Sequence, residues 1–179
     1  MARPPKAREK VLDTYIALLH AEGERAATID TLAARAGVSK GGVLYHFPTK
    51  EALAEAVLAR FAEVAARDLA EMATAPEGPA HHFVRTSWVT EDAMDHSYNA
   101  VVRLAQSGHP PAVDALEALH ARWLEMIRTE VGDAGVAEAI MLIGDGLYHQ
   151  SAMPGAWSRR TFARNLDTLL ALVDRLKGA

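Results

Sequence analysis

The sequence predicts an all-α fold, and three observations carry that prediction. Alanine, the best helix former and a poor strand former, accounts for 35 of the 179 residues. Apolar residues recur at spacings of three and four, as they do along one face of a helix. No segment of the sequence sustains the alternation of apolar and polar residues that marks a half-buried strand.

Glycine and proline divide the chain into about nine expected helices. The breaks fall at positions such as Gly23, Pro48 and Gly132, where these residues end a helix or start a turn. The expected helices cover residues 7–22, 29–36, 40–46, 50–74, 79–94, 97–107, 110–130, 134–152 and 158–177.

Four of these helices carry a clear apolar stripe. The first helix has one around Tyr15, and the helix 50–74 has one that includes Leu53 and Phe61. The helix 110–130 has a third, from Val113 to Ile127. The last helix carries a stripe broader than one core-facing side needs: Phe162, Leu166, Leu169, Leu170, Leu172, Val173 and Leu176.

Composition excludes several classes of protein. The chain has no cysteine, which excludes a disulfide scaffold, a thiolate zinc site and a cysteine nucleophile. Neither a long apolar run nor a signal-peptide pattern is present, so we expect a cytoplasmic protein without a membrane partner. The net charge of −4 is uneven. Residues 1–50 hold 8 basic and 5 acidic residues (+3), and residues 51–179 hold 11 and 18 (−7).

Residues 28–51 have the spacing of a helix-turn-helix. Thr28 can cap a short helix, and Gly37 follows it where a left-handed residue ends a helix cheaply. Ser39 can cap a second helix that Pro48 ends. A small residue at 33, Gly37 and an aliphatic residue at 43 fit the close crossing of the two helices. A helical hairpin with a glycine turn and a solvated face fits the same spacing.

The second of these helices has an unusual outer face. We expect Val38, Val43 and Leu44 to point inward, which leaves Gly41 and Gly42 outside. Each glycine costs a helix about 1 kcal/mol relative to alanine. Two glycines here are understandable if the helix backbone must come close to another surface, because glycine has no side chain to keep the two apart. Lys40, Tyr45 and His46, on the same face, can donate hydrogen bonds to phosphates or base edges.

The stretch 28–53 resembles the DNA-binding domain of the TetR family of transcriptional regulators. The resemblance is carried by Thr28-Ile29, Leu32-Ala33, Ala36-Gly37-Val38-Ser39, Gly42-Val43-Leu44-Tyr45-His46-Phe47 and Lys50-Glu51-Ala52-Leu53. It implies a three-helix helix-turn-helix domain over residues 1–49 and a helical bundle for effector binding and dimerisation over 50–179. It also implies a regulator of transcription, most simply a repressor, and neither an enzyme nor a cofactor-binding protein.

The resemblance places the DNA contacts on particular residues. Lys50, Thr28 and Tyr45 are expected at phosphates, and Lys40, Gly41, Gly42 and His46 near base edges, with Ser39 also at a family contact position. Many members carry bulkier residues where this chain has Gly41-Gly42. The partner implied is a palindromic double-stranded DNA operator.

A homodimer is expected, since one short reading helix covers few base pairs. The resemblance places its interface on the last two helices, at Tyr148, Phe162, Leu166, Leu169 and Val173. The small and apolar residues of the helix 134–152 would allow close approach there: Ala137, Ile140, Met141 and Gly144. The alternative is that both helices belong to the core of one chain.

The middle helices carry aromatic and methionine residues typical of a broad apolar pocket. The candidate ligand-binding residues are Phe83, Trp88, Met94, Tyr98, Trp123, Met126, Met141 and Asp145. Gly144-Asp145-Gly146-Leu147 resembles an element of a subset that includes multidrug-responsive repressors, which implies a lipophilic or cationic effector. Asp145 could face such a cation or lie at the dimer interface.

The alternative hypothesis is a small helical metal-binding or hydrolytic protein. Six of the eight histidines lie beyond residue 80. Asp92 and His96 have the i, i+4 spacing that can hold a metal. However, the chain has no H-E-x-x-H motif, and spacing fixes no third ligand.

Overall fold

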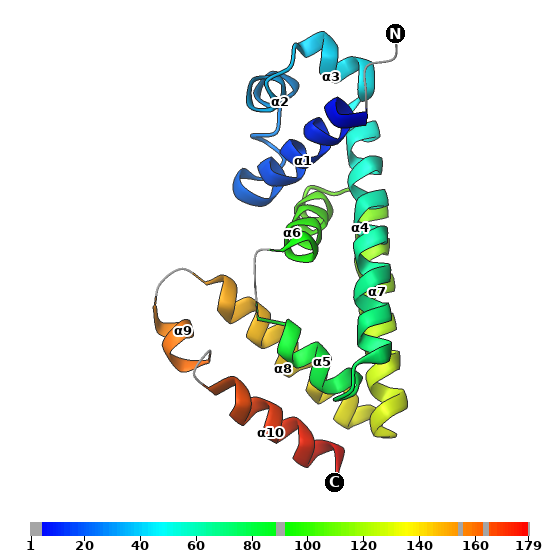
Figure 1. The fold of residues 1–179 in the computed structure, drawn as a ribbon, viewed down its shortest axis with the longest axis vertical. Coiled ribbons are helices and arrows are strands. Elements are labelled where there is room, and N and C mark those ends of the chain that lie inside the picture. Colours follow the sequence, from blue (N-terminus) through cyan, green and yellow to red (C-terminus); the bar gives the residue numbers. More distant parts are fainter. Residues whose placement is uncertain (1–4, 89–91, 154–155, 163–164, 179) are drawn as a thin grey trace. The chain divides into compact units, whose positions relative to one another are not determined.

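The computed structural model describes residues 5–88, 92–153, 156–162 and 165–178. These residues form ten helices and no strand, as Figure 1 shows. The helices are α1 (Pro5–Glu22), α2 (Ile29–Ala36), α3 (Lys40–His46), α4 (Lys50–Thr74), α5 (Pro79–Thr86), α6 (Ala93–Gln106), α7 (Pro110–Val131), α8 (Ala134–Ala152), α9 (Trp157–Thr161) and α10 (Leu166–Lys177). The predicted all-α fold is confirmed. None of the described helices is both long and apolar enough to cross a membrane.

Three of the expected helices differ from the structure. The helix expected at 79–94 ends at Thr86, and residues 89–91 of that range lie outside the described residues. Helix α6 starts at Ala93, four residues before its expected start, because Asp92 caps it. The Asp92 carboxylate accepts the amide hydrogens of Met94 at 2.8 Å and Asp95 at 3.0 Å. The helix expected at 158–177 becomes α9 and α10, and residues 163–164 between them are not described.

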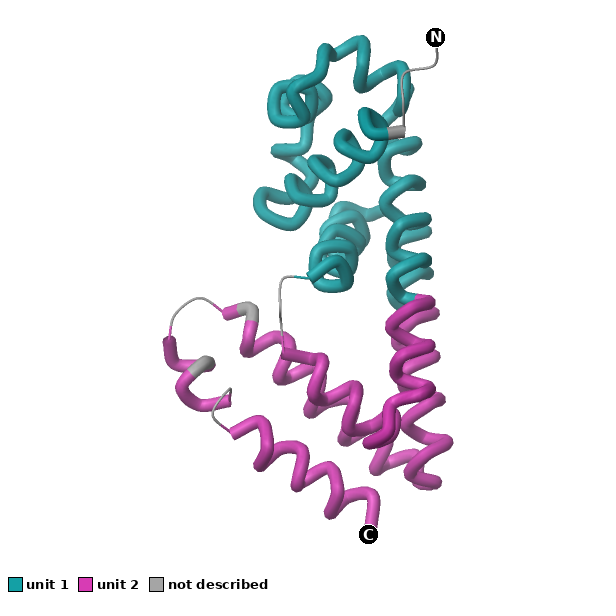
Figure 2. Tube along the Cα trace, viewed as in Figure 1, with its two compact units in different colours: residues 1–65, 91–117 teal, residues 66–90, 118–179 magenta. Residues whose placement is uncertain are grey.

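The chain packs into two compact units, which Figure 2 distinguishes by colour. Unit 1 comprises residues 1–65 and 91–117, and unit 2 comprises residues 66–90 and 118–179. Helices α4 and α7 have residues in both units. The sequence predicts a division at residue 49 between a DNA-binding domain and an effector-binding and dimerisation domain. That division is one of function, so the two packing units do not test it.

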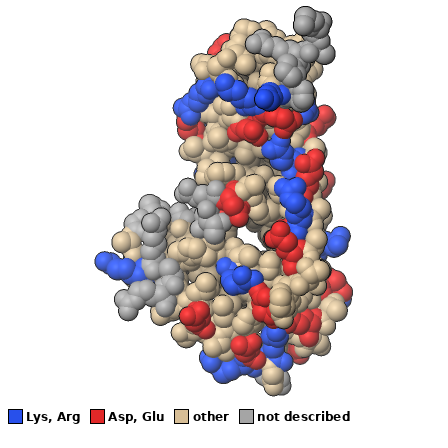
Figure 3. All heavy atoms as spheres, viewed as in Figure 1, with Lys and Arg blue, Asp and Glu red and all other residues tan. Residues whose placement is uncertain are grey.

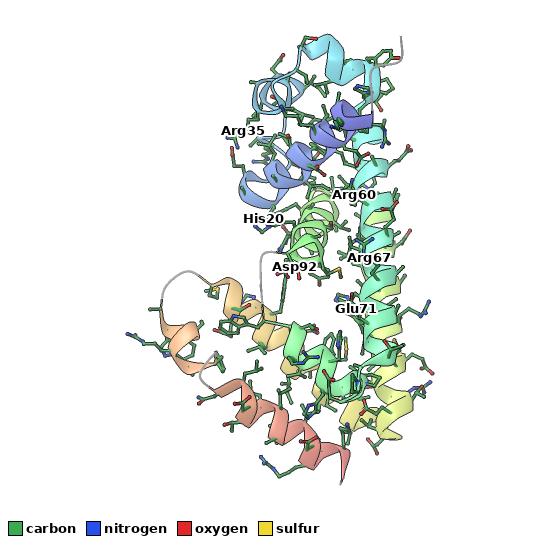
Figure 4. All side chains as sticks on the ribbon, in the orientation of Figure 1. His20, Arg35, Arg60, Arg67, Glu71 and Asp92 are labelled. Carbon is green, nitrogen blue, oxygen red and sulfur yellow. The ribbon has the colours of Figure 1, made fainter. Side chains whose placement is uncertain are left out.

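Unit 1 is built around α1, which packs against α2, α3 and α6. Its inner stripe is buried, and Val11, Tyr15 and Leu19 are each at most 1% exposed. Charged groups join α1 to α4 as well. Arg60 of α4, labelled in Figure 4, donates to Asp13 at 3.1 Å and also pairs with Glu9. The first helix therefore supports the short helices that follow it.

In unit 2, α5 packs against both α8 and α10, and α8 also contacts α10 (Figure 1). Phe83, Ile140 and Val173, one from each helix, share its buried cluster. Glu130 of α7 joins two further elements. Its carboxylate accepts the amide hydrogen of Ala80, in the first turn of α5, at 2.7 Å, and it pairs with Lys177 of α10.

Candidate nucleic-acid interface

Helix α2 begins and ends as the sequence predicts. The Thr28 hydroxyl accepts the amide hydrogen of Thr31 at 3.1 Å, so it caps the helix. Gly37 adopts the left-handed conformation at φ 61°, and the Val38 amide then donates to the carbonyl of Ala33 at 3.0 Å. Ala33 is 7% exposed. A small buried side chain at this position lets α2 and α3 cross closely.

Helix α3 is short and fixed at both ends. Ser39 caps it by accepting the amide hydrogen of Gly42 at 3.0 Å, and the Phe47 amide closes it on the carbonyl of Val43 at 2.8 Å. Val43 is fully buried, and Phe47 is 1% exposed. These two side chains anchor α3 to unit 1 and fix which face of the helix points outward.

The predicted DNA contacts lie on α3 and its N-cap Ser39, together with Thr28 at the start of α2 and Lys50 at the start of α4. Thr28, Ser39, Lys40, Gly41, Tyr45 and Lys50 are exposed, and Gly42 and His46 are half-buried. Tyr45 is 75% exposed, with its ring edge-to-face against His46 at 5.1 Å between centroids. Leu44, expected to point inward, is 39% exposed, and Val38 is only half-buried. A seven-residue helix supported from one side buries one residue fully, and that residue is Val43.

Basic side chains of this region are paired with acids, which the sequence analysis did not anticipate. Lys40 Nζ lies 3.0 and 3.1 Å from the two carboxylate oxygens of Asp30 on α2. Arg35, labelled in Figure 4, lies 2.6 Å from Glu22. Lys50 lies 3.9 Å from Glu24, which makes a looser pair. Figure 3 accordingly shows blue and red atoms next to one another over unit 1.

Six of the eight predicted ligand-binding residues lie in unit 2. Phe83 and Met141 belong to its buried cluster, and Trp88, Trp123 and Met126 pack against that cluster. The Trp123 ring is 5.4 Å from the rings of Phe83 and His120, measured between centroids. Its indole N–H donates to Asp68 at 2.7 Å. The structure thus adds His120 and Asp68, from α7 and α4, to the aromatic residues expected here.

Asp145 is the sixth of these residues, and its environment is unusual. The residue as a whole is exposed, yet burial of its carboxyl group raises its pKa, and His120 partly opposes that shift. Met94 and Tyr98, the remaining two candidates, lie on α6 in unit 1. There the Tyr98 ring is 6.4 Å from that of Phe61.

The predicted interface residues divide into two groups. Val173 is fully buried inside its own chain, so its side chain offers no surface to a partner. Tyr148, Phe162, Leu166 and Leu169 are half-buried. The small and apolar face of α8, with Ala137, Ile140, Met141 and Gly144, is turned toward the core of unit 2. A Cβ atom at Gly144 would meet Phe83 of α5, so the close approach occurs within one chain.

Sequence reasoning missed the exposed side of α8. Leu142 is 71% exposed, and among the described residues nothing outside the helix's own backbone lies within 4 Å of a Cβ built at Gly146, one turn along the helix. Leu142 and Gly146 are four residues apart in the sequence, the spacing at which a bulky and a small residue share one face of a helix. The apolar pattern of α8 continues all round the helix, however, and so did not show which side faces outward.

The described residues contain no group of three or more His, Cys, Asp or Glu that could hold a metal ion. Asp92 of the proposed Asp92/His96 pair instead caps α6. The His96 ring packs edge-to-face against His20 of α1, 5.1 Å away between centroids.

The capped helices α2 and α3, with the left-handed Gly37 in the turn between them, form what we call the reading unit. This unit defines a helix-turn-helix DNA-binding protein, here with a helical C-terminal region. Comparison with protein families agrees. The family model for bacterial regulatory proteins of the tetR family matches residues 11–57. The model for the tetracyclin repressor-like C-terminal domain matches residues 77–174. The chain belongs to the TetR family of transcriptional regulators, which are DNA-binding proteins and not enzymes.

Two relatives are similar to about a third of the chain. Two proteins of Pseudomonas putida are 36% identical over 58 residues: the transcriptional regulator SrpR and the uncharacterized transcriptional regulator TtgW. The match covers 32% of this chain. It spans 27% of SrpR and 43% of TtgW, less than half of either relative.

Solved structures resemble the whole chain. GusR of Salmonella enterica has a TM-score of 0.67 at 18% identity, covering 100% of this chain and 99% of its own. The multidrug-binding protein EbrR in complex with malachite green has a TM-score of 0.66 at 22% identity, covering 96% and 98%. At these identities the likeness concerns the fold alone.

Proposed function

We propose that the protein is a ligand-released repressor that binds a palindromic operator as a homodimer. The observation that carries this proposal is the outward face of α3, where capping and two buried anchors hold polar and glycine residues outside. A helix held in this way can enter a major groove, and Gly41 and Gly42 let its backbone approach the base edges.

The predicted contact residues each have a role in the proposal. Thr28, Tyr45 and Lys50 bind phosphates and set the register of the domain on the duplex. Lys40 and His46 donate to base edges, and Ser39 sits at the entrance of the reading helix. Two copies related by a two-fold axis read half-sites separated by about 34–36 Å or a multiple of it.

The dimer forms through the outer sides of α8 and α10. Leu142 and Gly146 provide an apolar side chain beside an open position on α8. The proposed surface also takes in four half-buried residues: Tyr148 of α8, Phe162 at the end of α9, and Leu166 and Leu169 of α10. An isologous interface of this kind brings each patch against its own copy, so both apolar sides are covered at once.

The effector is a lipophilic or cationic small molecule. The aromatic group of Phe83, Trp123 and His120 supplies apolar surface and ring faces, which attract cations. The partly desolvated carboxyl of Asp145 would be stabilised in its charged form by a bound cation. That EbrR binds malachite green makes this cationic dye a suitable probe.

Ligand release requires the effector to prefer one conformation of the dimer. Helix α4 starts two residues after Pro48, directly behind the reading unit, and continues to Thr74. A ligand that shifts α4 changes the separation of the two reading helices. It lowers operator affinity only by its differential affinity for the two states.

The experiment starts with selection of a binding site from a random duplex library by the wild-type protein. Gly42→Glu, which puts a carboxylate on the reading face, is expected to abolish binding to that site and to leave the dimer intact. The matched control is Gly135→Glu, which adds the same charge in the first turn of α8. Fluorescence anisotropy measures binding to the selected site, and light scattering measures the mass of the dimer. Unchanged binding by Gly42→Glu would show that α3 does not read DNA.

A second experiment tests the effector. Malachite green is expected to raise the melting temperature and to weaken operator binding. Asp145→Asn should weaken dye binding while operator affinity without dye stays unchanged. If Asp145→Asn alters the dimer dissociation constant and not dye binding, Asp145 belongs to the interface and the cation role is wrong.

A further inference from the structure

The lysine at the start of the reading helix is paired with an aspartate of the preceding helix. Lys40 is the first residue of α3, and both carboxylate oxygens of Asp30 lie within 3.1 Å of its Nζ atom. Asp30 belongs to the first turn of α2. Ten residues separate the two in sequence, so only the crossing of α2 and α3 brings them together.

Both residues are accessible to DNA. Their side chains are 59% and 74% exposed. An exposed pair of this kind adds little to the free energy of unfolding. An ammonium group has three N–H donors. The two oxygens of Asp30 leave at least one donor free to point away from α2.

An aspartate on a DNA-binding surface has an electrostatic cost, because it repels the phosphate backbone. The same side chain neutralises Lys40, whose positive charge is poorly placed at the N-terminal end of a helix. A neutralised and oriented lysine attracts any phosphate less, and it keeps a fixed direction toward the groove. Both effects act against sequence-independent binding, which depends mainly on charge.

We propose that Asp30 is a specificity-determining residue, which holds Lys40 away from phosphates and aims its remaining N–H at a base-edge acceptor. Asp30 is a positioning residue here, since Lys40 makes the contact. The acceptors available in the major groove are the N7 and O6 atoms of guanine, N7 of adenine and O4 of thymine. This inference rests on the proposed reading role of α3.

The test compares Asp30→Asn, Lys40→Ala and the double variant with the wild-type protein by site selection from a random duplex library. Asp30→Asn keeps the side-chain shape and removes the charge. It is expected to bind non-specific duplex about 2- to 5-fold more tightly at low salt. It should also lose about 5-fold of the preference at one base pair of each half-site. Lys40→Ala should lose the preference at that same base pair, and the double variant should lose no more.

Two further variants exclude a merely structural role. Asp30→Glu is expected to restore the base preference, because it keeps the carboxylate. Glu22→Gln breaks the corresponding pair with Arg35 outside the reading helix, and it should leave every base preference unchanged. An unchanged preference in Asp30→Asn, or a loss at a base pair that Lys40→Ala does not affect, would overturn the inference. Failure of the proposed function looks different, since the wild-type protein would then select no site or Gly42→Glu would still bind it.

Discussion

Two glycines of α8, only two positions apart, should respond in opposite ways to the same substitution. A Cβ atom at Gly144 would lie 2.8 Å from Cδ1 of Phe83 and from Oγ of Ser87, and closer still to another ring atom. At Gly146, by contrast, such a Cβ meets nothing within 4 Å in the described part of the chain, apart from the backbone of its own helix. Gly144→Ala and Gly146→Ala therefore form a matched pair with and without a clash.

The neighbours of Gly144 are poorly able to move. Phe83 is 5% exposed, and its ring packs against Trp123. Ser87 is 8% exposed and donates to the carbonyl of Phe83 at 2.7 Å. Ordinary contact starts at 3.4 Å, so the ring must shift by more than about half an ångström, which leads to the strain of an overpacked core.

The magnitude follows from two opposing contributions to the free energy of unfolding. Alanine stabilises a helix interior by about 1 kcal/mol relative to glycine, and both variants share this gain. Overpacking costs Gly144→Ala about 1–3 kcal/mol. Gly146→Ala should thus be more stable than the wild-type protein by about 1 kcal/mol. The free energy of unfolding of Gly144→Ala should lie about 1–3 kcal/mol below that of Gly146→Ala. For a chain of this size the difference corresponds to about 3–10 °C in melting temperature.

Circular dichroism melts would measure the difference, repeated over a range of protein concentrations. The concentration series is needed because Gly146 lies on the proposed dimer surface, and a weaker dimer would make the midpoint depend on concentration. Adding Phe83→Leu to Gly144→Ala should recover part of the lost stability, which a double-mutant cycle detects. The reasoning is refuted if Gly144→Ala proves as stable as Gly146→Ala at every concentration.

Two other predictions concern single side chains. Burial, with smaller contributions from Glu24 and Glu51, raises the pKa of Tyr15 from 10.0 to about 12. The unfolded chain therefore releases this proton first, and stability should fall from pH 10 to about pH 12 by on the order of 2 kcal/mol. The urea midpoint should fall less steeply with pH in Tyr15→Phe than in the wild-type protein. An equal fall in both proteins would show that Tyr15 does not cause the loss of stability. Glu130→Ala should destabilise the chain by about 1–3 kcal/mol, because the buried Ala80 amide loses its acceptor. Glu130→Gln keeps an acceptor oxygen and should lose less, and equal losses would show that the hydrogen bond contributes little.

The sequence predicts the reading unit well because its signals are local. Thr28, Gly37 and Ser39 each act on an amide or a turn within three or four residues, and the structure places all three as expected. The same reasoning failed at Asp92. There, aspartate followed by residues of good helix propensity reads as the middle of a helix as readily as its start.

Contacts between helices were beyond the reach of sequence spacing. The pair of Lys40 with Asp30 depends on a crossing angle, and no periodicity encodes it. Gly144 was predicted to allow close helix approach, yet only the structure shows that the neighbour is Phe83 of the same chain. For Val173 and Leu142, a stripe that runs all round its helix leaves the buried and the exposed side undetermined.

The ion pairs also change how the charge of the chain relates to DNA binding. The formal charge of +3 over residues 1–50 suggests a basic surface, but Arg8, Arg35, Lys40 and Lys50 each lie within 4 Å of a carboxylate. The formal count already includes these acids, so pairing leaves the net charge at +3. It does place an opposite charge beside each of these four basic side chains, which weakens the attraction of each one for a phosphate. On the proposed function, one domain holds DNA weakly by charge alone, and stable binding requires base contacts made by both copies of the chain. Dimerisation would then supply affinity that other DNA-binding domains obtain from excess positive charge.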